Sequence, residues 1–196
     1  MMHRQLQSSY QEAARLFHWL SDSKECLEQT VKASSLIAEA FQLGYKVLIC
    51  GNGGSLCDAV HFAEEFTGRY RKDRAPLPVI ALSDPAHLTC VGNDYGFEEV
   101  FSRGLQAYAK SGDILVVLST SGNSKNIIQA VTLAKRLSLK TVALLGKDGG
   151  KLRGECDVEW IVPAQTSDRI QEIHMAILHT VIEGVERLLF PHLYES

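Results

Sequence analysis

Short apolar runs alternate with longer amphipathic stretches along most of this chain of 196 residues. The apolar runs are rich in Val, Ile and Leu, as is typical of strands that are buried on both faces of a sheet. They predict strands at 46–50, 78–82, 113–118, 140–145 and 158–162. The amphipathic stretches repeat with the period of a helix and separate or follow these strands. They predict helices at 5–20, 24–43, 55–70, 97–109, 125–137 and 168–190.

This alternation of strands and helices predicts an α/β fold. Right-handed crossovers would join the strands into a five-stranded parallel sheet covered on both faces, which is a three-layer α/β/α sandwich. The helices within residues 1–43 are additional to this unit, and their apolar stripes must pack on the sheet or against another subunit. Because no linker interrupts the chain, we expect one domain over 1–196, with 1–43 as a helical extension in a homo-oligomer.

Small and hydroxyl-bearing residues follow two of the predicted strands. Cys50-Gly51-Asn52-Gly53-Gly54-Ser55 follows the first, and Ser119-Thr120-Ser121-Gly122-Asn123-Ser124 follows the third. Parallel sheets bind ligands beyond the carboxyl ends of their strands, where loop and helix N–H groups face an anion. A helix N-cap needs only one of the four hydroxyls in the second loop. This loop therefore predicts a phosphate site, and its lack of lysine favours a phosphate that is held rather than transferred.

The first loop superficially resembles a dinucleotide-binding fingerprint. That motif needs glycine where Leu56 stands, and the acidic ribose-binding residue expected about 20 residues later is missing from a second strand. A Walker loop is excluded because the chain contains no Gly-Lys-Ser/Thr sequence. A tight strand-to-helix turn would explain one or two glycines. Asn52 beside three glycines instead favours the close approach of a ligand.

Two further polar pairs are candidates for chemistry. His61 and Glu65 lie four residues apart in the helix that the first loop opens, so they share one face and could share a ligand or a proton. Such a pair is also common on helix surfaces. Asn93 and Asp94 lie between predicted helices, where they indicate either a turn or a group that binds sugar hydroxyls.

The last predicted helix carries four polar residues of interest. Asp168 is expected to cap its N-terminus together with Gln171. His174 and His179 are expected in the core or at an interface. Gln171 and His179 lie about 12 Å apart along the helix, which is awkward for one compact site in a single chain. Symmetric packing would let Gln171 of one subunit meet His179 of another.

Composition narrows the function classes. The net charge of −3 and a pI of about 6.2 give no support to nucleic-acid binding by a basic face. The basic residues at 69–74 fit a solvated loop after a helix better than a site-facing arginine. No apolar run reaches membrane-spanning length, and the N-terminus lacks the apolar core of a signal peptide. Five irregularly spaced cysteines argue against a disulfide framework, so we expect a cytoplasmic protein that does not act at a membrane.

Several of the motifs described above occur, together with others along the chain, in one known family. The chain resembles the SIS-domain sugar isomerases, and within them the phosphoheptose isomerases. The matching motifs follow the family's order and cover nearly the whole chain: Cys50-Gly51-Asn52-Gly53-Gly54-Ser55, His61-Phe62-Ala63-Glu64-Glu65, Thr67-Gly68-Arg69-Tyr70, Val91-Gly92-Asn93-Asp94, Ser119-Thr120-Ser121-Gly122-Asn123-Ser124, Gly146-Lys147-Asp148-Gly149-Gly150 and Arg169-Ile170-Gln171-Glu172-Ile173-His174.

The resemblance implies a flavodoxin-like SIS fold and a homotetramer with active sites at subunit interfaces. It implies conversion of D-sedoheptulose 7-phosphate to D-glycero-D-manno-heptose 7-phosphate, the first step toward ADP-heptose for the lipopolysaccharide core. It also implies one zinc ion per subunit, held by His61, Glu65, Gln171 and His179. By the same match, substrate is bound by Asn52, Gly53, Gly54, Glu65, Asn93, Asp94, Ser119, Thr120, Ser121, Ser124 and Gln171.

The implied reaction suits the residue types. Ketose–aldose interconversion through an enediol needs a base that moves a proton between adjacent carbons and an acid that serves the oxygens. Glu65 is the expected base and His179 the expected acid. Zinc accepts the nitrogen and oxygen ligands of this set and would stabilise negative charge on the enediolate. The base and ligand roles of Glu65 partly compete, and the sequence leaves their balance open.

Three alternatives would use the same phosphate loops. A non-catalytic SIS protein would bind a partner such as a replication initiator, but that branch lacks the counterparts of Glu65 and His179, which favours the enzyme. A regulator that senses sugar phosphates would carry a DNA-binding module, and none is attached. An aminosugar-phosphate isomerase is left open, because the loop chemistry would serve it equally well.

Overall fold

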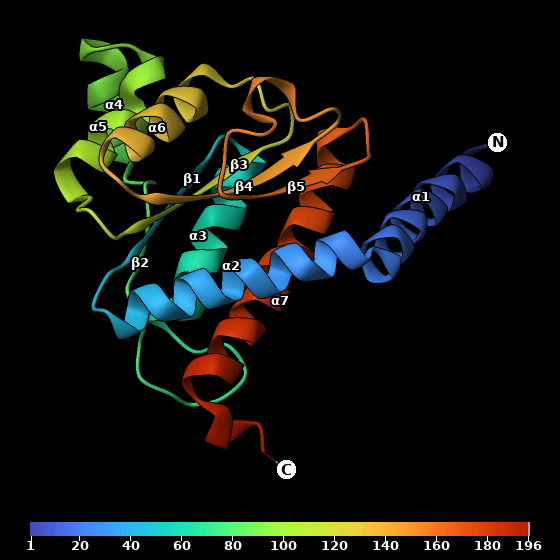
Figure 1. Cartoon of the computed structure of the whole chain (residues 1–196). Coiled ribbons are helices and arrows are strands. Elements are labelled where there is room, and N and C mark those ends of the chain that lie inside the picture. The colour runs from blue at the N-terminus through green and yellow to red at the C-terminus, as the bar shows by residue number, and fades with distance from the viewer. Residues whose placement is uncertain (196) are drawn as a thin grey trace.

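The computed structural model describes residues 1–195 and forms a three-layer α/β/α sandwich (Figure 1). Within these residues the central sheet has five parallel strands in the order β2-β1-β3-β4-β5. The strands are β1 (Val47–Gly51), β2 (Val79–Ala81), β3 (Ile114–Ser119), β4 (Lys140–Gly146) and β5 (Val158–Val162). The predicted fold class and the parallel five-stranded sheet are confirmed.

The sheet separates two hydrophobic cores, because successive side chains of a strand point to opposite faces. In β1, Val47 and Ile49 enter one core, while Leu48 and Cys50 enter the other. All four are fully buried, which explains why this strand reads as a continuous apolar run. The first core is covered by α2 (Lys24–Gln42), α3 (Gly54–Thr67) and α7 (Ser167–Leu189), and the second by α4 (Pro85–Asp94), α5 (Val100–Tyr108) and α6 (Lys125–Arg136).

The largest difference from the sequence-based expectation is α4, which ends at Asn93 and Asp94, where a turn is expected. The helix begins after Asp84, whose carboxylate accepts a hydrogen bond from the amide of His87 at 2.7 Å, and Pro85 occupies its first turn. Both are helix-start signals. With only 10 residues, α4 has too few apolar positions to reveal a helical period. The helix predicted over 97–109 is also divided, into a 3₁₀ turn η1 (Phe97–Glu99) and α5.

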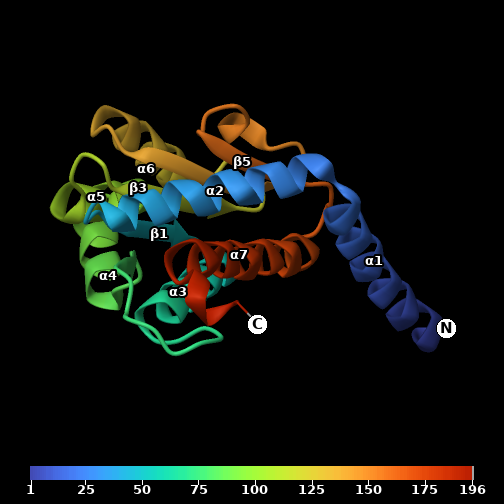
Figure 2. The ribbon, with the colours of Figure 1, turned by 60° about the horizontal axis from the view of Figure 1, so that its bottom comes forward.

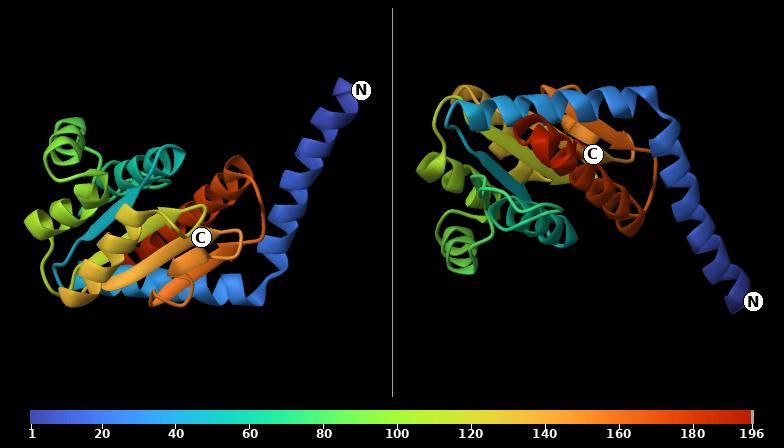
Figure 3. Two further views of the ribbon diagram at one scale, coloured as in Figure 1. Left: turned by 90° about the horizontal axis from the view of Figure 1, so that it is seen from above. Right: turned by 90° about the horizontal axis from the view of Figure 1, so that it is seen from below.

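The two N-terminal helices differ in how they pack. α2 lies against α7, where Ala33 and Ile37 are fully buried in the first core. α1 (Met2–Asp22) leaves the body of the molecule, as Figures 2 and 3 show from three sides. Leu6 and Tyr10 of α1 are exposed, so much of its apolar surface is uncovered in the single chain. No helix among residues 1–195 is long and apolar enough to cross a membrane.

The start of α7 differs from the expected cap. Thr166 is the N-cap residue, and Asp168 lies inside the first turn, so the predicted capping pair of Asp168 and Gln171 is wrong. His174 is fully buried, in agreement with its predicted place in the core. Its Nε2 atom lies 2.9 Å from the carbonyl oxygen of Leu145 in β4.

We expect His174 to lower the free energy of unfolding as the solution is acidified. Burial lowers the pKa of His174 from 6.5 to about 4, and the hydrogen bond to the Leu145 carbonyl opposes this only in part. Between these two values the unfolded chain binds a proton that the folded chain does not. Stability is therefore complete above pH 6.5 and is lost as the pH falls toward 4, by an amount on the order of 3 kcal/mol.

Urea unfolding at fixed protein concentration, repeated from pH 7 to pH 4, measures this dependence. His174→Gln should unfold more easily than the parent at pH 7 but lose less stability over the acidic range. An equal loss in both proteins would show that His174 is not responsible.

Candidate active site

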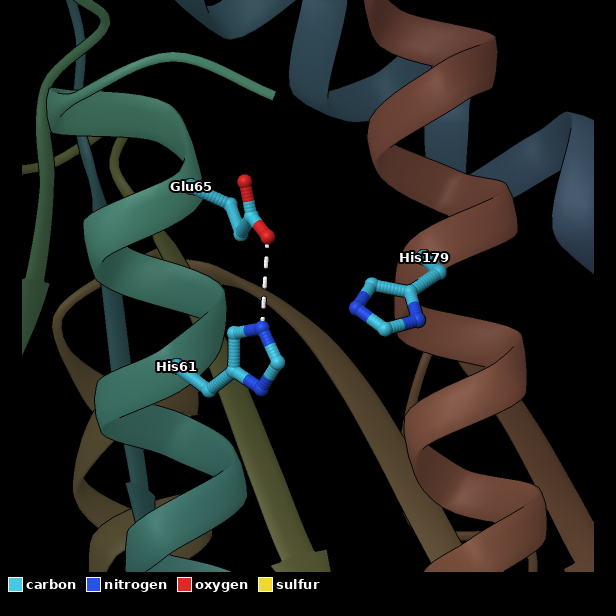
Figure 4. Close-up of side chains that lie close together, drawn as sticks. All are labelled: His61, Glu65 and His179. Carbon is cyan, nitrogen blue, oxygen red and sulfur yellow. Dashed lines mark hydrogen bonds and ion pairs between the residues drawn. The ribbon is translucent and has the colours of Figure 1, made fainter. Parts of the chain in front are cut away.

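Helices α3 and α7 pack together and bring His61, Glu65 and His179 into one group, which we call the acid–base cluster (Figure 4). Nε2 of His61 lies 3.2 Å from Oε1 of Glu65. The His61 and His179 rings meet edge to face, with centroids 5.1 Å apart. One ligand atom from each residue lies within 4.8 Å of the other two. The helical spacing places His61 and Glu65 on one face of α3. The packing of α7 against α3 adds His179, which comes from a distant part of the chain.

The surroundings of His179 favour its neutral form. Burial lowers the pKa of His179, and the nearby His61 lowers it further, while Glu65 has the opposite effect. The ring of Tyr70 stacks on the imidazole, with centroids 5.8 Å apart and an interplanar angle of 25°. A neutral imidazole has one nitrogen that donates a proton and one that accepts a proton or a metal ion.

Asp58 is a further acidic residue near this cluster that the sequence analysis did not single out. It lies on α3 three residues before His61 and seven before Glu65, so the three share one helix face. Burial raises the pKa of Asp58 to about 6, although His61 acts in the opposite direction. Its Oδ2 atom has no hydrogen-bond partner within residues 1–195. The i, i+3, i+7 spacing was the signal that could have identified it.

The second loop forms a compact turn between β3 and α6. The hydroxyl of Ser119 accepts a hydrogen bond from the amide of Gly122 at 3.1 Å and donates one to the hydroxyl of Ser124 at 3.4 Å. Ser124 is the N-cap residue of α6. Ser121 accepts from the amide of Asn123 at 3.2 Å, and the Thr120 hydroxyl lies 3.1 Å from that of Ser167. The hydroxyls of Ser119 and Ser124 therefore meet at the N-terminus of α6, where a helix favours an anion.

The first loop is attached to α6, the helix that follows the second loop, by a pair of amides. The side chains of Asn52 and Asn126 exchange two hydrogen bonds of 2.9 Å, and Asn126 is buried in the first turn of α6. Gln171 also joins this region, because its amide donates to the Ser55 hydroxyl at 3.4 Å and lies directly against Gly54. We call this group the loop cluster. Its members are Asn52, Gly53, Gly54, Ser119, Thr120, Ser121, Ser124 and Gln171.

The single chain does not bring all of the predicted site residues together. Gln171 contacts Gly54 and Ser55 at the start of α3, whereas Glu65 lies ten residues beyond Ser55 on that helix, so one chain does not place Gln171 with His61, Glu65 and His179. Gly54 and Glu65 are eleven residues apart on α3, about 16 Å along its axis.

Asn93 and Asp94 are also separate from both clusters. They lie at the exposed end of α4, where their side chains bond to each other at 2.7 Å. Among residues 1–195, no hydrogen bond joins them to either cluster.

The acid–base cluster has the chemistry of a metal site. Two imidazoles and a carboxylate are ligands that zinc accepts, and catalytic zinc sites commonly use three protein ligands with an open position. The 4.8 Å limit on the separation of the ligand atoms requires only small side-chain movements for all three to reach one ion at about 2.0–2.2 Å. These residues therefore fit zinc.

Gly122 is the position where the second loop is least tolerant of a side chain. It has φ +62, and a Cβ atom there would lie 1.8 Å from the carbonyl oxygen of Gly149. We expect Gly122→Ala to reduce the free energy of unfolding by about 3 kcal/mol or more and to raise KM for a phosphorylated substrate. Gly44→Ala is the control, because Gly44 has φ +75 and open space, and should cost about 1 kcal/mol. Equal losses in thermal or urea unfolding would contradict this account of the loop.

Comparison with known proteins gives a consistent result. Residues 10–146 match the model of the SIS domain family. The chain is 58% identical over 187 residues to the phosphoheptose isomerase of Fusobacterium nucleatum, covering 95% of this chain and 96% of that protein. It is 51% identical over 183 residues to that of Vibrio cholerae, covering 93% and 96%. The phosphoheptose isomerase structure from Neisseria gonorrhoeae matches with a TM-score of 0.88 and 37% identity, covering 95% of this chain and 99% of that one. The chain therefore belongs to the phosphoheptose isomerase family of SIS-domain enzymes.

Proposed function

We propose that this protein converts D-sedoheptulose 7-phosphate to D-glycero-D-manno-heptose 7-phosphate through an enediol. The observation that carries the proposal is the acid–base cluster, in which Glu65 and His179 face each other in a chain whose relatives are named phosphoheptose isomerases. A non-catalytic SIS protein would not need this pair. We propose a cytoplasmic location and a role at the entry to ADP-heptose and lipopolysaccharide core synthesis.

In the proposed mechanism, Glu65 removes a proton from C1 of the ketose while His179 donates a proton to the oxygen on C2. The product of this step is the enediol. Glu65 then returns its proton to C2, and His179 takes the proton from the oxygen on C1, which gives the aldose and restores both side chains. The depressed pKa of His179 is suited to this role, because a neutral imidazole can both donate and accept a proton.

We propose that His61, Glu65 and His179 hold one zinc ion per subunit, with Gln171 contributed by a neighbouring subunit. When bound, the zinc would stabilise the negative charge that develops on the substrate oxygens. Glu65 has two carboxylate oxygens to divide between the metal and the substrate proton. His61, 3.2 Å from Glu65, would orient this carboxylate.

We propose that the substrate phosphate binds at the loop cluster, through Ser119, Thr120, Ser121 and Ser124. The sugar would be contacted by Asn52, Gly53, Gly54 and Gln171. Asn93 and Asp94 would also contact it, either after α4 moves or when another subunit supplies them. Gly54, which we assign to the sugar, lies about 16 Å along α3 from Glu65, and this separation is longer than a heptose phosphate from its C1 to its phosphate. One substrate would therefore use the loop cluster of one chain and the acid–base cluster of another.

A homotetramer would supply that arrangement. The exposed apolar residues of α1 and a cavity of about 360 Å³ between α2 and α7 are surfaces that a second copy could cover. The cavity is lined by apolar residues that include Leu27, Val31 and Leu188. We propose that the whole chain acts as one SIS domain, with residues 1–43 packing in the oligomer.

The experiment that tests this function uses the purified protein with sedoheptulose 7-phosphate and, separately, glucosamine 6-phosphate and fructose 6-phosphate. We expect an aldoheptose phosphate from the heptulose alone, with the rate lost in a chelator and restored by zinc. Turnover of only the hexose phosphates would favour an aminosugar-phosphate isomerase. No turnover of any substrate, with or without zinc, would overturn the proposal.

A further inference from the structure

We propose that residues 68–75, the irregular segment between α3 and β2, position His179 against Glu65. We call them the clamp segment. This inference rests on the proposed function, because it concerns how the acid–base cluster is held. It assigns positioning roles to Tyr70 and Arg74, which lie outside the predicted site residues.

The clamp segment contacts α7 at three successive points. Tyr70 stacks on His179 with ring centroids 5.8 Å apart. Arg71 pairs with Glu183 at 2.6 Å. Arg74 pairs with Glu186, with Nε lying 2.8 Å from Oε1. The α7 residues are spaced by four and then three positions, so one face of that helix receives all three contacts.

Arg74 is the strongest of these attachments. Its side chain is 1% exposed, and that of Glu186 is 0% exposed. The guanidinium also donates to the carbonyl oxygens of Glu65 and Phe66, both at 2.7 Å. The last carbonyls of a helix have no partner inside that helix, so Arg74 satisfies groups at the end of α3. It thereby joins the turn that carries Glu65 to the helix that carries His179.

Arg74 departs from the interpretation of the basic residues at 69–74 as a solvated loop, whereas Arg69, Arg71 and Lys72 are exposed as that interpretation predicts. The Arg71 side chain is half-exposed, whereas the Arg74 side chain is buried and is paired with Glu186. Burying an arginine costs free energy unless its charge is paired and its donors are hydrogen-bonded, so a buried arginine indicates a specific structural role. Arg74 holds the end of α3 in place relative to α7.

Tyr70 acts on the ring of His179 itself. The imidazole is close to two other rings, because Tyr70 stacks on it and His61 meets it edge to face. Arg71 covers the Tyr70 ring, with its guanidinium carbon 5.1 Å from the centroid. Proton transfer depends steeply on geometry, and a displacement of about 1 Å can reduce the rate about 10²-fold. Fixing the ring plane of His179 is therefore a contribution to kcat.

The first test compares Tyr70→Leu with Tyr70→Phe. Tyr70→Leu, which loses the flat ring, should lower kcat by about 10-fold to 100-fold with KM changed less than about threefold. Tyr70→Phe keeps the ring and should retain kcat within about threefold. Crystal structures of both variants provide a readout that does not depend on activity. His179 should leave its ring orientation in Tyr70→Leu and keep it in Tyr70→Phe.

The second test compares Arg74→Lys with Lys72→Arg. Lysine keeps the charge but cannot donate to Glu186 and the two α3 carbonyls at once. Arg74→Lys should therefore lower kcat by about 10-fold and accelerate amide hydrogen exchange in the last turn of α3. Lys72→Arg, at an exposed position of the same segment, should change neither.

The outcomes separate this inference from the proposed function. An unchanged His179 ring in Tyr70→Leu, or unchanged exchange in Arg74→Lys, would overturn the positioning role whatever the enzyme does. Equal loss of kcat in Tyr70→Leu and Tyr70→Phe would also overturn it. If the parent protein does not isomerise the heptulose, the proposed function fails, while the crystallographic and exchange measurements still decide the positioning role.

Discussion

Glu65→Gln is expected to lower kcat by about 10³-fold, because amide nitrogen and oxygen cannot accept the proton that a carboxylate accepts from carbon. The substitution keeps the size and shape of the side chain. The fold should therefore survive, since the Arg74 contact to residue 65 uses the backbone carbonyl. Affinity for inorganic phosphate should also survive, because the loop cluster is distant from Glu65 along α3.

Glu64→Gln is the matched control for this prediction. Glu64 is the adjacent residue, and its side chain is 61% exposed, compared with 16% for Glu65. Kinetics of both variants, with circular dichroism and thermal unfolding, separate lost chemistry from lost structure. Near-normal turnover by Glu65→Gln would eliminate this residue as the base. A similar loss in Glu64→Gln would indicate a nonspecific effect of charge on α3.

The second large effect is expected in mixed oligomers. Each of Glu65→Gln, His179→Ala and Gln171→Ala should be nearly inactive as a pure protein. When Glu65→Gln and Gln171→Ala chains are co-expressed, some sites combine an intact acid–base cluster from one chain with an intact loop cluster from another. With equal mixing and random assembly, about a quarter of the sites should be complete and active.

The control hybrid mixes Glu65→Gln chains with His179→Ala chains. Both residues belong to the acid–base cluster of one chain, so every site in this hybrid retains a defect. We expect no recovery above the pure variants. Differently tagged chains allow the hybrids to be purified and assayed. Recovery in the second pairing, or none in the first, would contradict a site divided between these two clusters.

The sequence predicted the sheet well because buried parallel strands carry a local signal. The runs around Val47–Gly51 and Ile114–Ser119 are apolar along their length, since both faces of each strand are covered. α4 could not be recognised from its apolar period because it is too short, although Asp84 and Pro85 marked its start. Boundaries elsewhere differ by a few residues, as helix ends usually do.

In the acid–base cluster, only the pair whose spacing lies along one helix was predictable from the sequence. His61 and Glu65 are four residues apart, so any α-helix brings them together. The approach of His179 depends on how α3 packs against α7, which no local pattern encodes. The contact between Gln171 and Ser55 was equally unpredictable, because it also depends on how α7 packs against α3. The spacing of eight residues between Gln171 and His179 carries no information about it.

The most direct measurement of the central claim is proton NMR of the protein with sedoheptulose 7-phosphate in D₂O. An enediol formed through Glu65 predicts an aldoheptose phosphate that carries solvent deuterium at C2, except where the proton is returned before it exchanges. It also predicts slow loss of the C1 proton signal from the ketose. Both changes should disappear in Glu65→Gln and persist in Glu64→Gln. Absence of product and of exchange with the parent protein, with zinc present and with a chelator, would contradict the account.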